Sequence, residues 1–315
     1  MKSQYYATLL GLVLGDAMGS PIEYEHDRKI EMTELSDAEK LEMVPGLWTI
    51  DTASTLCLHA SLLQNNGLNL KDQLLKYAEL SAGTIYNELP VDLNDGIYKA
   101  IKRYQNNEDL ESFDLSQTDN SSLVRSAAIA LFNPNIEDLD STLEIATRSS
   151  FLTHGSQGVA DCCRVFVKLL VCALNGYTKE ELLSPKILDR MRVCNEIYEI
   201  FQRLQTNDLD ELVGYDDVFD SLEYSLKVFA HTENFSDGLL LAVNKSLDSN
   251  TIGAIYGQLA GAYYGLGSLK WTNQIYKINK LIEAIDYGWN RLDKEETSTS
   301  YSFRRVIKKR ISTSD

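Results

Sequence analysis

The chain has 315 residues, of which 44% are hydrophobic and 24% are charged, as in an ordinary globular protein. Its formal net charge of −16 excludes a general affinity for nucleic acid or for anionic lipid, because both need a basic surface. Five cysteines without a CxxC pair indicate reduced thiols and argue against a zinc site or a disulfide framework.

The N-terminal segment, MKSQYYATLLGLVLGDAMGS, is the first predicted helix. Its apolar run from Ala7 to Leu14 is short, Asp16 follows it closely, and Lys2 is its only basic residue, which distinguishes it from a secretory signal. No stretch of the chain approaches the roughly 18 apolar residues of a membrane-spanning helix. We therefore expect a cytoplasmic protein without a membrane span.

Helical periodicity continues along the chain, with apolar residues three and four positions apart. The segments with this pattern are 7–19, 52–64, 71–83, 93–105, 123–132, 139–152, 159–176, 186–204, 215–231, 236–247 and 251–266. Runs of alternating apolar residues with hairpin turns are not found. The sequence predicts an all-α fold of about a dozen helices, in one domain over residues 1–315 with a basic tail at 303–315.

Three polar stretches between the helices are longer than the rest, at 24–45, 104–122 and 204–216. None is long or biased enough in composition to be an interdomain linker. Long loops in a compact helical domain are often functional, which draws attention to the first two.

Two of the predicted helices carry a glycine at every fourth position. These are Gly11, Gly15 and Gly19 in the first, and Gly253, Gly257, Gly261 and Gly265 in the last. A glycine inside a helix costs about 1 kcal/mol relative to alanine. Residues four apart share one face, so a glycine stripe allows a second helix backbone to approach closely. We expect these two helices to be central and rigid.

Oxygen-bearing side chains crowd the starts of two predicted helices. Thr49 and Asp51 precede one, and Asp248, Asn250 and Thr251 precede the other. Such residues are good N-caps, and capping alone explains part of the pattern. Carboxylate, hydroxyl and amide oxygens are also the ligands of hard divalent cations, so two such clusters that met in space would form a magnesium or calcium site. Both interpretations stay open at this point.

Five motifs, in this order, resemble those of the ADP-ribosylglycohydrolases, which remove ADP-ribose from modified side chains. The opening GLVLGDAMGSPIE is similar to the family's GxxxGDAxGxPxE, and WTIDT to its WTDDT. The others are DNSSLVR (119–125), LTHGSQGVAD (152–161) and SLDSNTIGAIYGQLAGAYYG (246–265), which resemble the GNGxxMR loop, the TH segment and GGDxDTxGAIxGxxAGAxYG. The resemblance extends over nearly the whole chain and implies a compact all-α domain, monomeric as many members are.

The resemblance also implies roles for residues at the matching positions. The family holds two magnesium ions, and the matching ligands here are Thr49, Asp51, Asp248 and Thr251, with Asn250 at a further ligand position. Glu23 matches a glutamate that approaches the scissile ribose bond, and Asp16 joins it in the expected acid–base work. The residues matching those that line the ADP-ribose cleft are Asn120, Ser121, Arg125 and His154.

The chain departs from the family pattern at the same motifs. Ile50 and Asn250 replace two metal-binding aspartates, Ser246-Leu247 replaces a glycine pair, and Asp119 adds a carboxylate where a diphosphate would lie. Two magnesium ions carry four positive charges, whereas only Asp51 and Asp248 remain of the four aspartates. We therefore expect one weakly held magnesium ion at most, since fewer charged ligands lower the affinity for a strongly hydrated ion.

Two functions fit these features. The first is hydrolysis of an ADP-ribosyl bond on a protein or small molecule with a depleted metal site. The second is a catalytically silent descendant that binds ADP-ribose, or another protein, on the same fold. Glu23 and Asp16 favour the first. The four departures from the family pattern favour the second: Ile50, Asn250, Ser246-Leu247 and Asp119.

Overall fold

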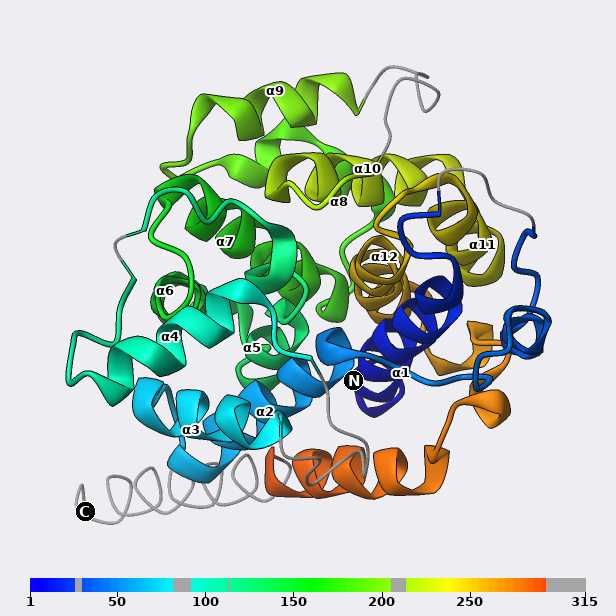
Figure 1. Ribbon diagram of the computed structural model, residues 1–315. Helices are drawn as coiled ribbons and strands as arrows, with labels where there is room; N and C mark the ends of the chain where they lie inside the picture. The colour runs from blue at the N-terminus through cyan, green and yellow to red at the C-terminus, as the bar shows by residue number, and fades with distance from the viewer. Residues whose placement is uncertain (26–29, 82–91, 113, 205–213, 293–315) are drawn as a thin grey trace, which may run out of the picture.

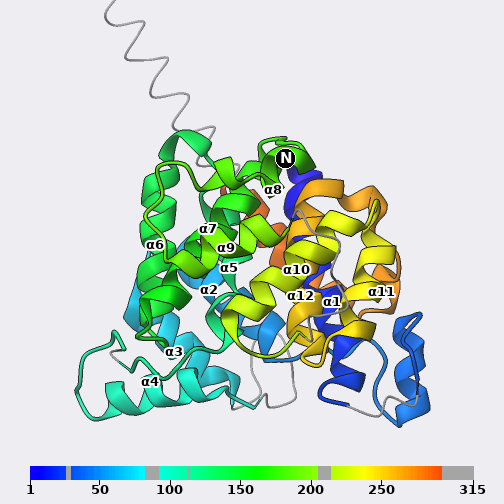
Figure 2. The same ribbon diagram turned by 90° about the horizontal axis from the view of Figure 1, so that it is seen from above.

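Two glycine-bearing helices, α1 (Lys2–Gly19) and α12 (Ser249–Tyr264), lie side by side in the middle of the molecule (Figure 1 and Figure 2). They run antiparallel, so that Gly11 faces Gly257 and Gly15 faces Gly253. A Cβ on Gly15 would lie 1.9 Å from the Gly253 carbonyl oxygen, and one on Gly11 would lie 2.2 Å from that of Gly257. The two backbones are therefore in direct contact, as the glycine stripes predicted.

The computed structural model describes residues 1–25, 30–81, 92–112, 114–204 and 214–292, so the predicted basic tail at 303–315 lies outside it. Helices α2 to α7 lie on one side of the α1–α12 pair and α11 lies on the other, whereas α10 packs on α12 and also contacts α7 and α11 (Figure 1 and Figure 2). Their bounds are α2 Ile50–Asn65, α3 Leu70–Leu80, α4 Asp95–Gln105, α5 Ser126–Phe132, α6 Leu139–Phe151, α7 Gln157–Leu174, α8 Lys179–Leu183, α9 Asn195–Arg203, α10 Val218–His231 and α11 Phe235–Lys245.

Short 3-10 turns connect these helices, including η1 (Ser20–Ile22), η2 (Leu35–Leu41) and η3 (Asn120–Ser122). A further helix covers residues 278–292. Within the described ranges the chain forms no strand, which confirms the predicted all-α fold. Among the same residues, no helix is both long and apolar enough to cross a bilayer.

The prediction of one helix over residues 186–204 was wrong. Pro185 opens a short 3-10 turn, Pro185–Leu188, and the chain then leaves the helical conformation at Asp189 (ψ 135°) and Arg190 (φ 66°). The backbone N–H of Cys194 donates to Asp161 Oδ2 of α7 at 3.0 Å and not to a helical carbonyl oxygen, and helix α9 begins at the next residue, Asn195. A long-range hydrogen bond overrides the local periodicity here.

His59 of α2 lies in the core. It is 4% exposed; its Nε2 faces the Tyr5 hydroxyl at 2.6 Å and its Nδ1 faces the Ala128 carbonyl oxygen at 3.1 Å. Burial lowers the pKa of His59 from 6.5 to about 4. A neutral ring that donates from Nδ1 and accepts at Nε2 satisfies both contacts.

The contact between α1 and α12 can be tested with Gly15→Ala. The added Cβ would collide with the Gly253 backbone and force the helices apart, so we expect a loss of about 3 kcal/mol in the free energy of unfolding. Urea titration followed by circular dichroism measures it. Gly267→Ala is the control, because a Cβ at Gly267 meets no atom within 4 Å. Equal stability of the two variants would contradict the backbone contact.

The buried His59 predicts a loss of stability in mild acid. The unfolded chain takes up a proton near pH 6.5 and the folded chain only near pH 4, so stability is full above pH 6.5 and falls as the pH drops through this window. The difference amounts to about 3 kcal/mol. In His59→Gln, which keeps a donor and an acceptor, the free energy of unfolding should fall less between pH 7 and pH 4.5 than in the wild type. Parallel pH profiles for the two proteins would contradict the assignment.

Candidate functional site

The candidate site lies where the C-terminal end of α1 meets the N-terminal end of α12. A Cβ on Gly19 would lie 2.2 Å from the Ser249 carbonyl oxygen, so the chain after α1 passes directly beside α12. The Tyr24 N–H donates to the Leu247 carbonyl oxygen at 2.7 Å, with Tyr24 in the left-handed region (φ 54°). Strained backbone of this kind is concentrated at functional sites. The contact holds Glu23 close to Asp248.

Asp16 connects α1 to the start of α2. Its Oδ1 accepts a hydrogen bond from the Thr49 hydroxyl (2.8 Å), and its Oδ2 accepts from the Thr49 N–H, the Thr52 N–H and the Thr52 hydroxyl (2.9, 3.1 and 2.6 Å). The side chain is fully buried. Both carboxylate oxygens are thus occupied by the first turn of α2, and Asp16 acts on the site by positioning Thr49 and Asp51.

The start of α2 combines a cap with a free carboxylate oxygen. Thr49 is the N-cap, and its hydroxyl accepts a hydrogen bond from the Asp51 N–H at 3.3 Å. Asp51 is 4% exposed, yet its Oδ2 has no hydrogen-bond partner among the described residues. Ile50 is partly buried and packs against the hydrophobic core. The capping interpretation therefore holds for Thr49 and leaves Asp51 unexplained.

The start of α12 is different, because Asp248 occupies the N-cap position without capping the helix. Its Oδ2 instead accepts a hydrogen bond from Asn120 Nδ2 at 2.6 Å. Thr251 lies in the first turn of α12 and counteracts the rise in the pKa values of both Asp248 and Asp51, so it is close to the carboxyl groups at both helix starts. Asn250 is 4% exposed, and its Oδ1 has no partner among the described residues. The two clusters thus converge in space, as the second interpretation of the sequence required.

Burial and mutual repulsion raise the pKa values of the carboxyl groups here. Burial and the charges of Asp16 and Asp248 hold the pKa of Asp51 well above its usual range. Burial raises the pKa of Asp248 to about 6. Burial, Asp248 and Asp16 together raise the pKa of Glu23 to about 7. Such shifts mark a site where negative charge is concentrated without a counter-charge.

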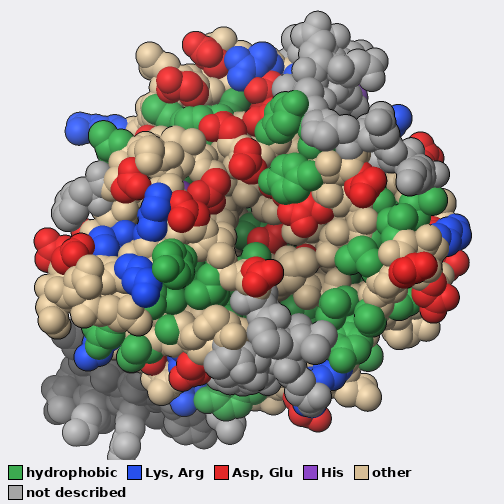
Figure 3. All heavy atoms as spheres, viewed as in Figure 1, with side chains coloured by type: hydrophobic (Ala, Val, Ile, Leu, Met, Phe, Trp, Pro, Cys, Tyr) green, Lys and Arg blue, Asp and Glu red, His purple; other side chains and the backbone are tan. Residues whose placement is uncertain are grey.

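The available oxygens fit one hard cation. Asp51 Oδ2 and Asn250 Oδ1 are buried without a hydrogen-bond partner, and a cation would satisfy both. Across the described ranges, no Lys or Arg forms an ion pair with Asp51 or Asp248, and no three His, Cys, Asp or Glu side chains lie close enough together to hold a metal alone. Figure 3 shows a hollow near the middle of the molecule with Asp and Glu side chains in and around it.

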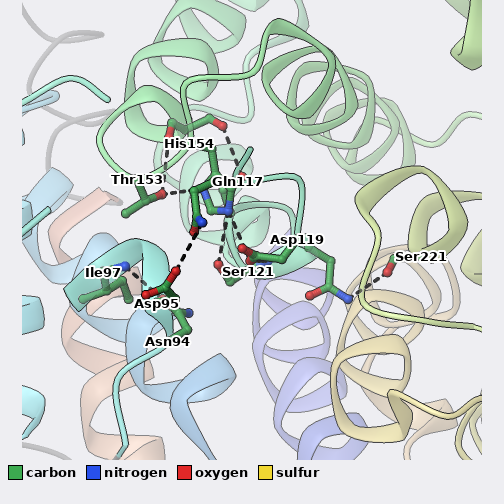
Figure 4. Close-up of polar contacts among 12 residues, drawn as sticks. Asn94, Asp95, Ile97, Gln117, Asp119, Ser121, Thr153, His154 and Ser221 are labelled. Atoms are coloured by element: carbon green, nitrogen blue, oxygen red, sulfur yellow. Dashed lines mark hydrogen bonds and ion pairs between the residues drawn. The ribbon is translucent and has the colours of Figure 1, made fainter. Parts of the chain in front are cut away.

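The loop before α5 brings a second group of polar side chains to the site (Figure 4). The Asp119 carboxylate lies 3.1 Å from His154 Nε2, and the Ser121 hydroxyl lies 3.5 Å from the same nitrogen. The Thr153 hydroxyl holds His154 Nδ1 at 2.7 Å. The contact with His154, together with hydrogen bonds from Ser121, holds the pKa of Asp119 below its usual range. The carboxylate expected to repel a diphosphate is therefore tied to a histidine that is itself fully buried.

Arg125 lies in the core beneath this loop and donates hydrogen bonds to it. It is 1% exposed and donates to the Ser121 carbonyl oxygen (2.9 Å), the Ser149 carbonyl oxygen (3.4 Å) and the Thr153 hydroxyl (2.6 Å). Its guanidinium also lies 5.5 Å from the centre of the Tyr77 ring. Arg125 and His154 thus fix the loop that carries Asn120 and Ser121, whereas the sequence predicted that all four residues line the cleft.

The sequence analysis did not single out two neighbours of the site. Tyr24 follows Glu23 and is 46% exposed, and the acidic groups around it raise the pKa of its hydroxyl beyond the effect of burial. Gly214 accepts hydrogen bonds from the Leu247 and Asp248 N–H groups at 3.2 and 3.0 Å. Neither residue is part of a helical pattern in the sequence. Only the folded chain shows that both lie next to the candidate site.

Comparisons with known proteins agree with this geometry. The first 298 residues match the family model of ADP-ribosylglycohydrolase. A solved structure described as "ADP-ribosylglycohydrolase-related protein complex" superposes with a TM-score of 0.79 at 29% identity, over 92% of this chain and 98% of that one.

The relatives of this chain include named hydrolases. The chain is 28% identical over 279 residues to "ADP-ribosylarginine hydrolase Tri1" of Pseudomonas putida, covering 85% of this chain and 72% of that protein. It is 24% identical over 279 residues to "ADP-ribosyl-[dinitrogen reductase] glycohydrolase" of Rhodospirillum rubrum, covering 84% and 88%. With the family match over nearly its whole length, this chain belongs to the ADP-ribosylglycohydrolase family.

Proposed function

We propose that this protein hydrolyses the bond between ADP-ribose and a modified side chain, with Glu23 as the base that takes a proton from the attacking water. The observation that carries the proposal is the environment of Glu23 and its effect on the pKa of the side chain. It is partly buried beside Asp248, and its pKa of about 7 matches what a general base needs near neutral pH.

One magnesium ion fits the proposed site. Asp51, Asp248, Asn250 and Thr251 would hold it, with Thr49 completing the set, because these side chains supply oxygen ligands and two of them have unsatisfied buried oxygens. When bound, such an ion neutralises the acidic cluster and polarises the oxygens of the ribose. Asp16 holds Thr49 and Asp51 in place through the hydrogen bonds to α2.

Arginine-linked ADP-ribose is the substrate that we propose to test first. The Pseudomonas putida relative is an ADP-ribosylarginine hydrolase. The acidic side chains at the site, Glu23, Asp51 and Asp248, would also attract a guanidinium group. Asn120 and Ser121 would contact the ADP-ribose, whereas Arg125 and His154 would hold their loop rigid.

A second function, binding of ADP-ribose without hydrolysis, is favoured by two features. Ile50 occupies the second position of the WTIDT motif and packs against the core, so it offers no ligand. Asn250 offers an oxygen without charge. A site that lost catalysis could keep the cleft and its loop for recognition alone.

The raised pKa of Glu23 leads to a direct prediction. In metal-free protein, NMR titration of Glu23 should give a pKa near 7. Asp248→Asn removes a neighbouring negative charge, so it should lower the pKa of Glu23 towards the ordinary value of 4.5. A Glu23 pKa near 4.5 already in the wild type would contradict its assignment as the base.

Turnover distinguishes the two functions. Release of ADP-ribose from arginine-modified protein should fall by about a hundredfold or more in Glu23→Gln, because general-base catalysis contributes a factor of this order. Glu25→Gln is the matched control, since Glu25 is an exposed glutamate two residues away, and its rate should equal that of the wild type. Wild-type protein that binds ADP-ribose by calorimetry, yet releases none from arginine- or serine-modified proteins, would establish the binding function instead.

A further inference from the structure

Asp119 is the residue before η3, and the proposed hydrolysis gives it no role. It forms an antiparallel backbone bridge with Asp217, which holds the loop before α5 against the start of α10. The next residue, Asn120, donates from Nδ2 to Asp248 Oδ2 at 2.6 Å. Because consecutive Cα atoms are only about 3.8 Å apart, Asp119 lies beside the candidate site.

A series of hydrogen bonds runs from Arg125 to the Asp119 carboxylate, and its direction follows from the chemistry of the groups. A guanidinium group only donates, so Arg125 Nη2 donates to the Thr153 hydroxyl at 2.6 Å. The Thr153 proton is then available to His154 Nδ1 at 2.7 Å, which is closer than its other acceptor, the Ser150 carbonyl oxygen at 3.3 Å. An ionised carboxylate only accepts, so His154 Nε2 carries a proton that points to Asp119 at 3.1 Å (Figure 4). The orientation of Asp119 is thus fixed from the core.

The two oxygens of the Asp119 carboxylate differ in their surroundings. Oδ1 accepts from the Ser121 N–H at 3.0 Å and is the oxygen that His154 Nε2 contacts. The His154 side chain is fully buried, whereas the Asp119 side chain is 30% exposed. Oδ1 is therefore held towards the core, and Oδ2 is the oxygen that a ligand can reach. Although burial raises it, the contacts with His154 and Ser121 hold the pKa of Asp119 below its usual range, so the carboxylate is ionised at neutral pH.

The chemistry of this carboxylate limits which part of ADP-ribose it can bind. The diphosphate is an anion, so a carboxylate repels it. The hydroxyl groups of the two riboses are donors that suit an ionised acceptor. In dinucleotide-binding folds an Asp or Glu binds the 2-hydroxyl of a ribose in this way.

We propose that Asp119 is a specificity-determining residue that accepts a hydrogen bond, through Oδ2, from the 2-hydroxyl of one ribose of ADP-ribose. Thr153 and His154 are positioning residues in this arrangement, because they act only through Asp119. The proposal rests on the proposed function in taking ADP-ribose as the ligand, and it applies equally to hydrolysis and to binding alone. It gives Asp119 an attractive role, whereas the sequence alone suggested only repulsion of the diphosphate.

Calorimetric titration with ADP-ribose tests the sign of the effect. Asp119→Asn should weaken the affinity about tenfold, because a hydrogen bond to a charged acceptor contributes a factor of this order. The His154 Nε2–H would hold the new amide oxygen, so the NH₂ group would face the ligand where an acceptor is needed. Asp109→Asn is the matched control, because it removes an exposed charge beyond the C-terminal end of α4 and should leave the affinity unchanged. An affinity of Asp119→Asn equal to or higher than that of the wild type would overturn the proposal, as would a wild-type protein that binds no ADP-ribose.

Two analogues of ADP-ribose identify the hydroxyl, one without the 2-hydroxyl of the adenosine ribose and one without that of the terminal ribose. One of them should bind the wild type about tenfold more weakly than ADP-ribose does. The same analogue and ADP-ribose should bind Asp119→Asn equally, because the partner of the hydroxyl is already lost. An equal loss in both proteins, or no loss with either analogue, would contradict the assignment. The measurement is separate from turnover: if this pattern holds while no ADP-ribose is released from modified proteins, the hydrolase function fails and the role of Asp119 stands.

Discussion

The direct contact between the backbones of α1 and α12 is the constraint on which the site depends. Only glycine at Gly11, Gly15, Gly253 and Gly257 allows it, since a single Cβ would overlap a carbonyl group. The contact runs antiparallel, so it places the end of one helix at the start of the other. The acidic residues after α1 and those before α12 come together for this reason, and the hydrogen bonds that Asp16 accepts from Thr49 and Thr52 then add the start of α2.

The electrostatics of the site follow from that arrangement. Carboxyl groups from three helix ends are brought into a buried space without an arginine or lysine paired to Asp51 or Asp248 within the described residues. Their pKa values rise as a result. Folding brings these charges together at a cost in stability, which a bound cation or a cationic substrate group would offset. By contrast, the Asp119 carboxylate is held by a contact with His154, and Arg125 donates a hydrogen bond to the same loop.

Much of this arrangement could be predicted from the sequence, because helical periodicity and glycine spacing are local signals. They gave the all-α fold and the close approach of α1 to α12. Two of the failures concern interactions between distant residues. The helix at 186–204 is interrupted by the bond between Asp161 and the Cys194 backbone, and the contact of Asp119 with His154 joins two loops that no local pattern relates. The helix at 278–292 has apolar residues at suitable spacing and was missed.

The antiparallel contact also determines when the site can exist. Asp16 and Asp51 are made early in synthesis, whereas Asp248 and Thr251 come from the last third of the chain. Pairing such distant segments is slow, because the entropy of closing a long loop must be overcome before their contacts form. A nascent chain therefore carries the glycine face of α1 uncovered until α12 emerges, and its acidic cluster is incomplete before then. A cation at the proposed site would thus bind only after α1 and α12 have paired.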